Sequence, residues 1–153
     1  MAAGGRLATG EAIQLRAGVA ARPVRLAHPP PALAGREELL TELDARLAGG
    51  DGPGPWTVAL HGRAGAGKTS VALEYAHRHR AEVGLAWQFA AGDRAVLAAG
   101  FGQLAAELDA RRRGNAWDAV ASVHRVLAAF PARWLLVFDD APDPESVRAF
   151  LPC

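Results

Sequence analysis

The sequence predicts an α/β fold in which helices cover both faces of a parallel sheet. Three short apolar runs, at residues 56–61, 84–90 and 134–138, have the length and composition of buried strands. Stretches with the apolar spacing of helices alternate with these runs, which favours crossover connections and therefore parallel strands. A glycine-rich segment, GRAGAGKT, lies between the first strand-like run and the next helical stretch. This order of elements is typical of a doubly covered sheet.

The remaining elements follow in order. Residues 37–47 carry apolar side chains at positions 39, 40, 43 and 47, which is the spacing of an amphipathic helix. A loop rich in glycine and proline, residues 49–55, ends that helix. Further helices are predicted at residues 70–79, 94–111, 117–130 and 143–150, and Pro131 ends the one at residues 117–130.

Length, charge and cysteine content restrict the class of protein. The chain has 153 residues, a formal net charge of +1 and one cysteine, Cys153. That length fits one domain with a sizeable core. The near-neutral charge gives no electrostatic support for a nucleic-acid or membrane-surface partner, and we expect neither. One cysteine cannot form an internal disulfide, and no apolar run reaches the roughly 18 residues of a membrane span. We therefore expect a cytoplasmic protein.

The chain divides into a linker and a domain. The first 33 residues carry four arginines and one acid and end in consecutive prolines. We expect residues 1–32 to be a basic, proline-rich linker that is disordered in part. A basic arm that touches nucleic acid is the alternative interpretation. The folded, nucleotide-binding domain is placed at residues 33–153.

Residues 62–69 match the phosphate-binding pattern G-x-x-x-x-G-K-[ST]. Glycines allow backbone N–H groups to wrap a polyphosphate, and the following helix adds its positive N-terminal end. Lys68 is the single lysine among 17 basic residues. It supplies a compact cation that a planar guanidinium cannot replace, and Thr69 supplies a hydroxyl for Mg²⁺. The residues expected to contact the nucleotide here are Gly62, Arg63, Ala64, Gly65, Ala66, Gly67, Lys68, Thr69 and Ser70.

The third strand-like run ends in two acids, Asp139 and Asp140. In a Walker B element the first acid holds Mg²⁺, usually through water, and the second polarises the attacking water. The expected catalytic residues are therefore Lys68, Asp139 and Asp140, and the expected metal ligands are Thr69 and Asp139. Turn chemistry is the alternative for the two acids, because the sequence DDAPDP also favours a turn.

Together these motifs resemble the NB-ARC-like signal-transduction ATPases of the STAND class. The resemblance rests on the entry LAGRE at residues 33–37, the phosphate loop, Trp87 in the second strand and LLVFDDA at residues 135–141. The chain is similar in particular to actinobacterial members that carry tetratricopeptide repeats after the ATPase core. The resemblance covers roughly residues 33–152.

The resemblance implies a three-layer αβα P-loop NTPase fold that is incomplete after the Walker B strand and the next helix. It implies a switch in which ADP holds a closed state and ATP opens it, followed by self-oligomerisation or release of an effector. The partners would be the nucleotide and, in a longer protein, the rest of the ATPase module and a repeat domain. By position, Ala34, Gly35 and Arg36 would lie along the adenine. We expect this chain to bind ATP or ADP with Mg²⁺ and to hydrolyse little by itself.

Two departures from the family matter. Close relatives often carry Asn where this chain has Asp140, and a second acid would favour hydrolysis. In the family the strand at residues 56–61 lies between the Walker B strand and a fourth strand that comes later in the chain. The 153 residues stop before that fourth strand, so we expect residues 56–61 to be an exposed apolar edge here.

A small P-loop kinase, with the arginines at 111–113 as its lid, is an alternative function. A non-catalytic fragment or the core of a transcriptional regulator is another.

Overall fold

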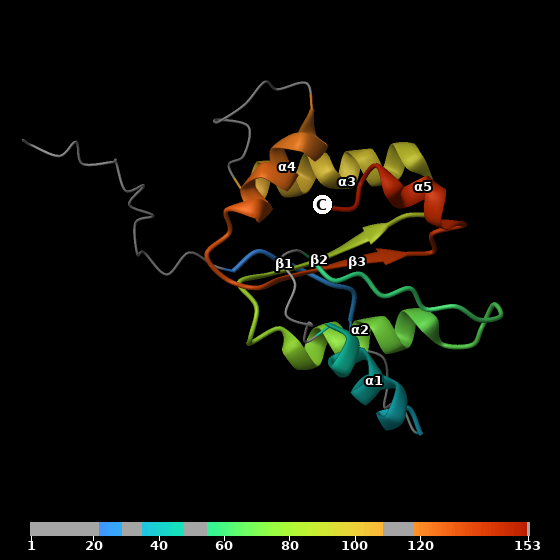
Figure 1. Cartoon of the computed structure of the whole chain (residues 1–153). Coiled ribbons are helices and arrows are strands. Elements are labelled where there is room, and N and C mark those ends of the chain that lie inside the picture. The colour runs from blue at the N-terminus through green and yellow to red at the C-terminus, as the bar shows by residue number, and fades with distance from the viewer. Residues whose placement is uncertain (1–21, 29–34, 48–54, 109–117, 153) are drawn as a thin grey trace, which may run out of the picture.

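The computed structural model describes residues 22–28, 35–47, 55–108 and 118–152. Within them, one or two helices follow each strand along the chain (Figure 1). In chain order the elements are β1 (Val24–Arg25), α1 (Glu37–Leu47), α2 (Lys68–His79), β2 (Leu85–Ala90), α3 (Arg94–Glu107), α4 (Ala119–Ala128), β3 (Trp134–Asp139) and α5 (Pro144–Arg148).

The strands form one parallel sheet in the order β1-β2-β3. β2 and β3 pair along their full length, from Leu85 opposite Trp134 to Ala90 opposite Asp139. In Figure 1, α3, α4 and α5 lie on one face of the sheet and α1 and α2 on the other. The α/β class and the parallel sheet predicted from the sequence are therefore confirmed. The carboxyl ends of β2 and β3 meet at one edge, where ligands of open α/β sheets bind.

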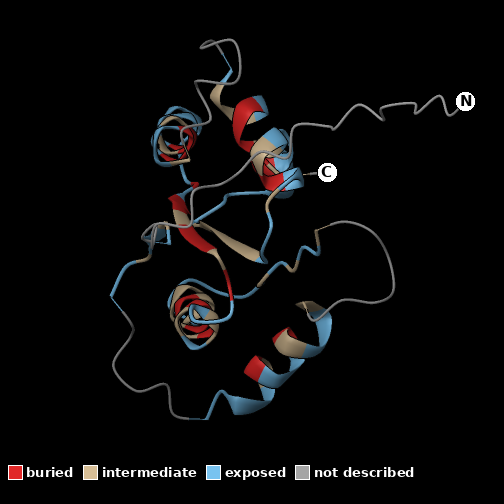
Figure 2. Cartoon of the chain, turned by 90° about the vertical axis from the view of Figure 1, so that its left-hand side faces the viewer, coloured by how far each residue is buried: buried red, intermediate tan, exposed pale blue. Residues whose placement is uncertain are grey.

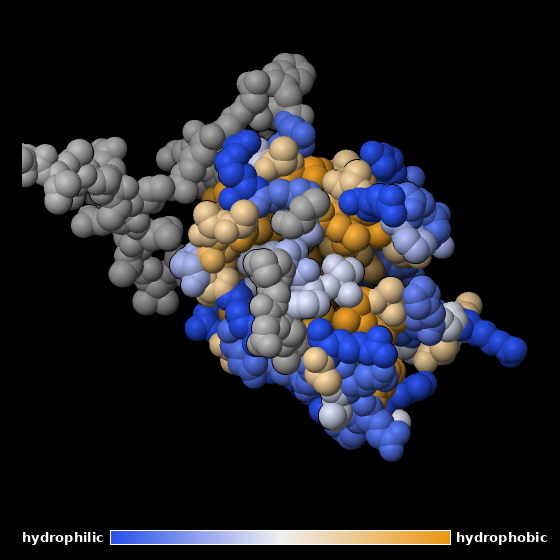
Figure 3. Space-filling model, viewed as in Figure 1, coloured by the Kyte–Doolittle hydropathy of each residue, from blue (hydrophilic) through white to orange (hydrophobic). Residues whose placement is uncertain are grey.

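Because side chains alternate along each strand, the two faces of the sheet belong to two separate hydrophobic cores. Trp87 and Phe89 of β2, with Phe138 of β3, pack among α3, α4 and α5. On the opposite face, Leu135 of β3 packs with α1 and α2. Figure 2 shows the buried parts of the helices turned toward the sheet, and Figure 3 shows hydrophobic residues between the two helical layers. Consequently, every second residue of β2 and β3 faces α2, and Asp139 is one of these residues.

Part of the predicted linker is a strand of the sheet. Val24 lies opposite Ala86 of β2, and the Ala86 N–H donates to the Pro23 carbonyl at 3.0 Å. The Arg25 guanidinium lies 5.4 Å from the Trp87 ring centroid and donates to Gln103. These partners are far away in sequence, so local composition gave no sign of them. Residues 1–21 and 29–34 lie outside the described residues.

The prediction of a buried strand at residues 56–61 is wrong. Within the described part of the chain these residues join no strand, and Trp56 is 49% exposed. Val58 and Leu60 still pack against the core cluster that α1 and α2 form, as Leu135 of β3 does. An extended segment becomes a strand only when a neighbour takes its backbone hydrogen bonds, and apolar composition does not supply that neighbour.

The helices begin and end close to the predicted residues, and aspartates fix three of their starts. The Asp93 carboxylate accepts from the N–H groups of Ala95 and Val96 and starts α3, which ends at Glu107 instead of the predicted residue 111. Asp118 and Asp143 cap α4 and α5 in the same way. The arginines at 111–113 lie outside the described residues. No helix within the described ranges is both long and apolar enough to cross a membrane.

A charged network fixes α1 against α2. The Arg78 guanidinium makes two hydrogen bonds to the Glu37 carboxylate, at 2.8 and 2.9 Å, and a third to Glu74 at 2.7 Å. The hydrogen bonds from Arg78 hold the pKa of Glu37 below its ordinary value of 4.5. Leu40 and Leu43 of α1 are buried and form one cluster with Val71 and Tyr75 of α2. The network thereby holds the start of α1 against the last turn of α2.

Candidate functional site

The glycine-rich segment at residues 62–69 forms a tight loop that runs directly into α2. Gly65 (φ 76°) and Gly67 (φ 84°) have left-handed backbone conformations, which side chains with a Cβ rarely adopt. The Ala66 N–H donates to the Arg63 carbonyl at 3.2 Å and closes a turn inside the loop. α2 starts at Lys68, so the free N–H groups of its first turn belong to Lys68, Thr69 and Ser70. Arg63 and Ala64 are exposed at the loop's outer bend.

Lys68 folds back over the loop that precedes it. Its ammonium donates to the carbonyls of Gly62 and Arg63, each at 3.0 Å. An ammonium group has three donors, so one remains for an anion after these two contacts. The positive charge therefore lies over the loop at the N-terminal end of α2, where the helix dipole also favours a negative ligand.

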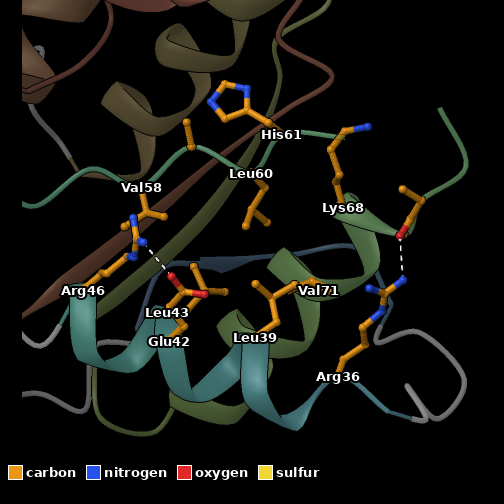
Figure 4. A pocket seen from close by; sticks show the side chains of 13 residues that line it. Arg36, Leu39, Glu42, Leu43, Arg46, Val58, Leu60, His61, Lys68 and Val71 are labelled. Carbon is orange, nitrogen blue, oxygen red and sulfur yellow. Dashed lines mark hydrogen bonds and ion pairs between the residues drawn. The ribbon is translucent and has the colours of Figure 1, made fainter. Parts of the chain in front are cut away.

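Arg36 connects the start of α1 to the same loop. Its guanidinium donates to the Ala66 carbonyl at 3.0 Å (Figure 4). Gly35, just before it, also has a positive φ of 73°. Two motifs that the sequence analysis identified separately are thus in contact. Ala34, the third residue expected along the adenine, lies outside the described residues.

Thr69 and Asp139 meet although 70 residues separate them in the chain. The Thr69 hydroxyl donates to Asp139 Oδ1 at 2.7 Å. Thr69 comes from the first turn of α2 and Asp139 from the last residue of β3, and both are half-buried. The contact follows from the fold, because the alternation of β3 turns Asp139 toward α2. The two residues that were expected to hold a metal are therefore in contact at the carboxyl edge of the sheet.

Gln88 is a further residue of this site, which the sequence analysis did not identify. Its amide Nε2 donates to Asp139 Oδ2 at 3.1 Å, and its Oε1 accepts from the Ala27 N–H at 2.9 Å. The signal was present in the sequence, because β2 reads LAWQFA and carries one amide in an apolar strand. Both oxygens of the Asp139 carboxylate are thereby held, one by α2 and the other by β2.

Asp140 differs from Asp139 in exposure and in backbone conformation. It is exposed and has a φ of 59°, and it is the one residue other than glycine with a positive φ among those described. Aspartate and asparagine adopt this conformation more readily than other side chains. The turn requirement alone is sufficient to explain an Asp or Asn at this position. The role of Asp140 in hydrolysis therefore stays a prediction.

A cavity of about 270 Å³ opens beside the loop. It lies between α1, residues 58–61 and the start of α2, and Figure 4 shows Leu39, Leu60 and Val71 pointing toward one another in it. Arg36 and Lys68 line its edge on the loop side. The cavity thus combines an apolar wall with three cations, Arg36, Arg46 and Lys68, and one anion, Glu42, which is paired with Arg46. An apolar wall with a net positive edge suits a ligand that carries negative charge.

The donor atoms at Thr69 and Asp139 fit Mg²⁺. A hydroxyl and a carboxylate are hard oxygen ligands, and Mg²⁺ is commonly held by one or two such groups together with phosphate oxygens and water. No cluster of three or more His, Cys, Asp or Glu side chains suited to a metal occurs within the described ranges. A metal bound chiefly by one carboxylate and a ligand's phosphates needs no such cluster.

Comparison with family models, curated proteins and solved structures found no match for this chain.

Proposed function

We propose that this chain is the ATP- or ADP-binding part of a STAND-type, NB-ARC-like regulatory ATPase with a P-loop NTPase fold. The observation that carries the proposal is the 2.7 Å contact between Thr69 and Asp139 at the end of the glycine-rich loop. Chance matches to an eight-residue motif give no reason for a distant aspartate to meet the motif's threonine. A phosphate-binding loop with a metal site requires that meeting.

Different residues of the site would bind different parts of the ligand. Backbone N–H groups of residues 62–69 and the Lys68 ammonium would hold the β- and γ-phosphates. The cavity beside α1 would take the nucleoside, with Arg36 at its edge. Thr69 and Asp139 would hold Mg²⁺, which neutralises phosphate charge when it is bound. Adenine specificity and the switch between ADP and ATP states come from the family resemblance.

Lys68→Ala tests the proposal directly. It removes charge-assisted phosphate contacts worth about 1.5–3 kcal/mol each, so the dissociation constant for Mg²⁺-ADP should rise about tenfold to a hundredfold. The matched control is Arg80→Ala, which removes a cation just beyond the opposite end of α2 and should leave the affinity unchanged. Isothermal titration of the 153-residue chain with Mg²⁺-ADP measures both.

Thermal melts complete the test because they also report folding. Mg²⁺-ADP at 100 times its dissociation constant should stabilise the wild-type chain by about 2.7 kcal/mol. The same ligand concentration should move the Lys68→Ala transition less. Equal affinity in the wild type and in Lys68→Ala would show that the loop is not the phosphate site. Phosphoryl transfer from ATP to a small acceptor would favour the kinase alternative instead.

A further inference from the structure

We propose that Gln88 is a positioning residue for the metal ligand Asp139 and that it links this carboxylate to the N-terminal segment formed by residues 22–28. The proposal rests on the proposed function, because the orientation of Asp139 matters only if Mg²⁺ and a nucleotide bind there. Gln88 is half-buried in the central strand β2, between Trp87 and Phe89. An amide at such a position needs partners for both of its ends.

The sheet register brings Gln88 to Asp139. Ala90 lies opposite Asp139, and Gln88 precedes Ala90 by two residues, so it is on the same face and diagonally adjacent. Its Nε2 reaches Asp139 Oδ2 at 3.1 Å, while the Thr69 hydroxyl reaches Oδ1 at 2.7 Å. Two donors from different elements fix the rotation of the carboxylate about its last side-chain bond.

The orientation of the Gln88 amide is set by its partners. The N–H of Ala27 can only donate, and an ionised Asp139 carboxylate can only accept. Oε1 must therefore face Ala27 and Nε2 must face Asp139, so the reversed amide would lose both hydrogen bonds. A glutamate lacks the donor, and a methionine of similar length lacks both groups.

The same amide ties the carboxylate to the N-terminal segment. Ala27 gives its N–H to Gln88 at 2.9 Å, and the Ala27 carbonyl lies 2.8 Å from His77 Nε2 of α2. One residue, Ala27, is thus held through its N–H by the central strand and through its carbonyl by the helix that follows the phosphate loop. Because Gln88 bonds both groups, an ordered carboxylate and a docked segment favour each other, and any ligand that needs one stabilises the other.

Mg²⁺ binding is the property that this arrangement should affect. Mg²⁺ requires nearly ideal octahedral geometry, and losing an outer partner of a metal ligand typically lowers metal affinity about 10–100-fold. Phosphate contacts from the loop and Lys68 do not pass through Gln88. If Gln88 is a positioning residue, its loss should therefore lower only the Mg²⁺-dependent part of the nucleotide affinity.

The test compares Gln88→Met with Gln103→Met in the 153-residue chain. Gln103 on α3 contacts Arg25 of the same N-terminal segment, but from the face of the sheet opposite to Asp139. A fluorescent ADP analogue is titrated with Mg²⁺ present and with EDTA. Gln88→Met should weaken Mg²⁺ binding to the ADP complex about 10–100-fold and leave affinity in EDTA within about twofold of wild type. Gln103→Met should change neither.

Ala27→Pro supplies a second variant at an exposed position. It deletes the N–H that anchors Gln88 Oε1 and should weaken Mg²⁺ binding in the same direction but by less. Unchanged Mg²⁺ affinity in Gln88→Met, or an equal loss in EDTA, would overturn the positioning role while nucleotide binding by the wild type upholds the proposed function. Unchanged Mg²⁺ affinity in Ala27→Pro would overturn the link to the segment. A wild type that binds no nucleotide in either condition would remove both proposals.

Discussion

Replacing Asp140 separates a backbone role from a carboxylate role. At a φ of 59°, a side chain with a Cβ costs about 1–2 kcal/mol in the left-handed region, and local hydrogen bonding lowers this cost for Asp and Asn. Glycine avoids the cost but loses about 0.5–1 kcal/mol of chain entropy on folding. Asp140→Ala should therefore be about 1 kcal/mol less stable than Asp140→Gly. Asp140→Asn should match the wild type.

Thermal melts of the three variants measure this order. About 1 kcal/mol corresponds to a difference in Tm of about 2–4 °C for a chain of this size. All three variants should bind Mg²⁺-ADP like the wild type, because Thr69 and Asp139 remain. If Asp140→Ala melted at or above Asp140→Gly, the account of the left-handed turn would be refuted. A drop in steady-state ATP hydrolysis in Asp140→Asn of a full-length version would assign the carboxylate to hydrolysis, and an unchanged rate would leave it to the turn.

Two further predictions concern α1 and the cavity. Arg78 lowers the pKa of Glu37, so this pair stabilises the fold above about pH 4.5 and the contribution is lost as the pH falls through the lowered pKa. Glu37→Gln should consequently melt below the wild type at neutral pH, with the gap closing under acid conditions; a constant gap would contradict this. Leu39→Trp enlarges a side chain that points into the 270 Å³ cavity and should weaken ADP binding at least about tenfold, or about 1.4 kcal/mol, while pyrophosphate binding stays the same. Titration calorimetry with both ligands measures the difference, and equal losses would show that the nucleoside does not lie there.

The sequence was sufficient where structure depends on local signals. α1 forms at the predicted residues, and β2 and β3 differ from the predicted runs by one residue at one end. Apolar periodicity and aspartate caps act over a few residues, so a single sequence displays them. The expected metal site also implied that Thr69 and Asp139 meet, and they do so although residues 56–61, the predicted strand before the loop, join no described strand.

The sequence was insufficient where a residue's role depends on a distant partner. β1 has two residues, and its position depends on Ala86 and Trp87 of β2. Residues 56–61 have strand-like composition but no strand partner in the part of the chain that the structure describes. Gln88 has its proposed role only because the fold places Ala27 and Asp139 within hydrogen-bond distance of its two amide atoms. Hydrogen-bond partners across the sheet are set by register, which periodicity does not reveal.

The separation of 70 residues between Thr69 and Asp139 also has a kinetic consequence. Contacts between distant parts of a chain form only after a large loop has closed, so parallel strand pairing is slow, and such contacts commonly form late in folding. A ligand that bridges α2 and β3 would then stabilise the native state more than the transition state. Such a ligand slows unfolding and leaves the folding rate almost unchanged. Nucleotide occupancy would in this way govern the lifetime of the folded domain.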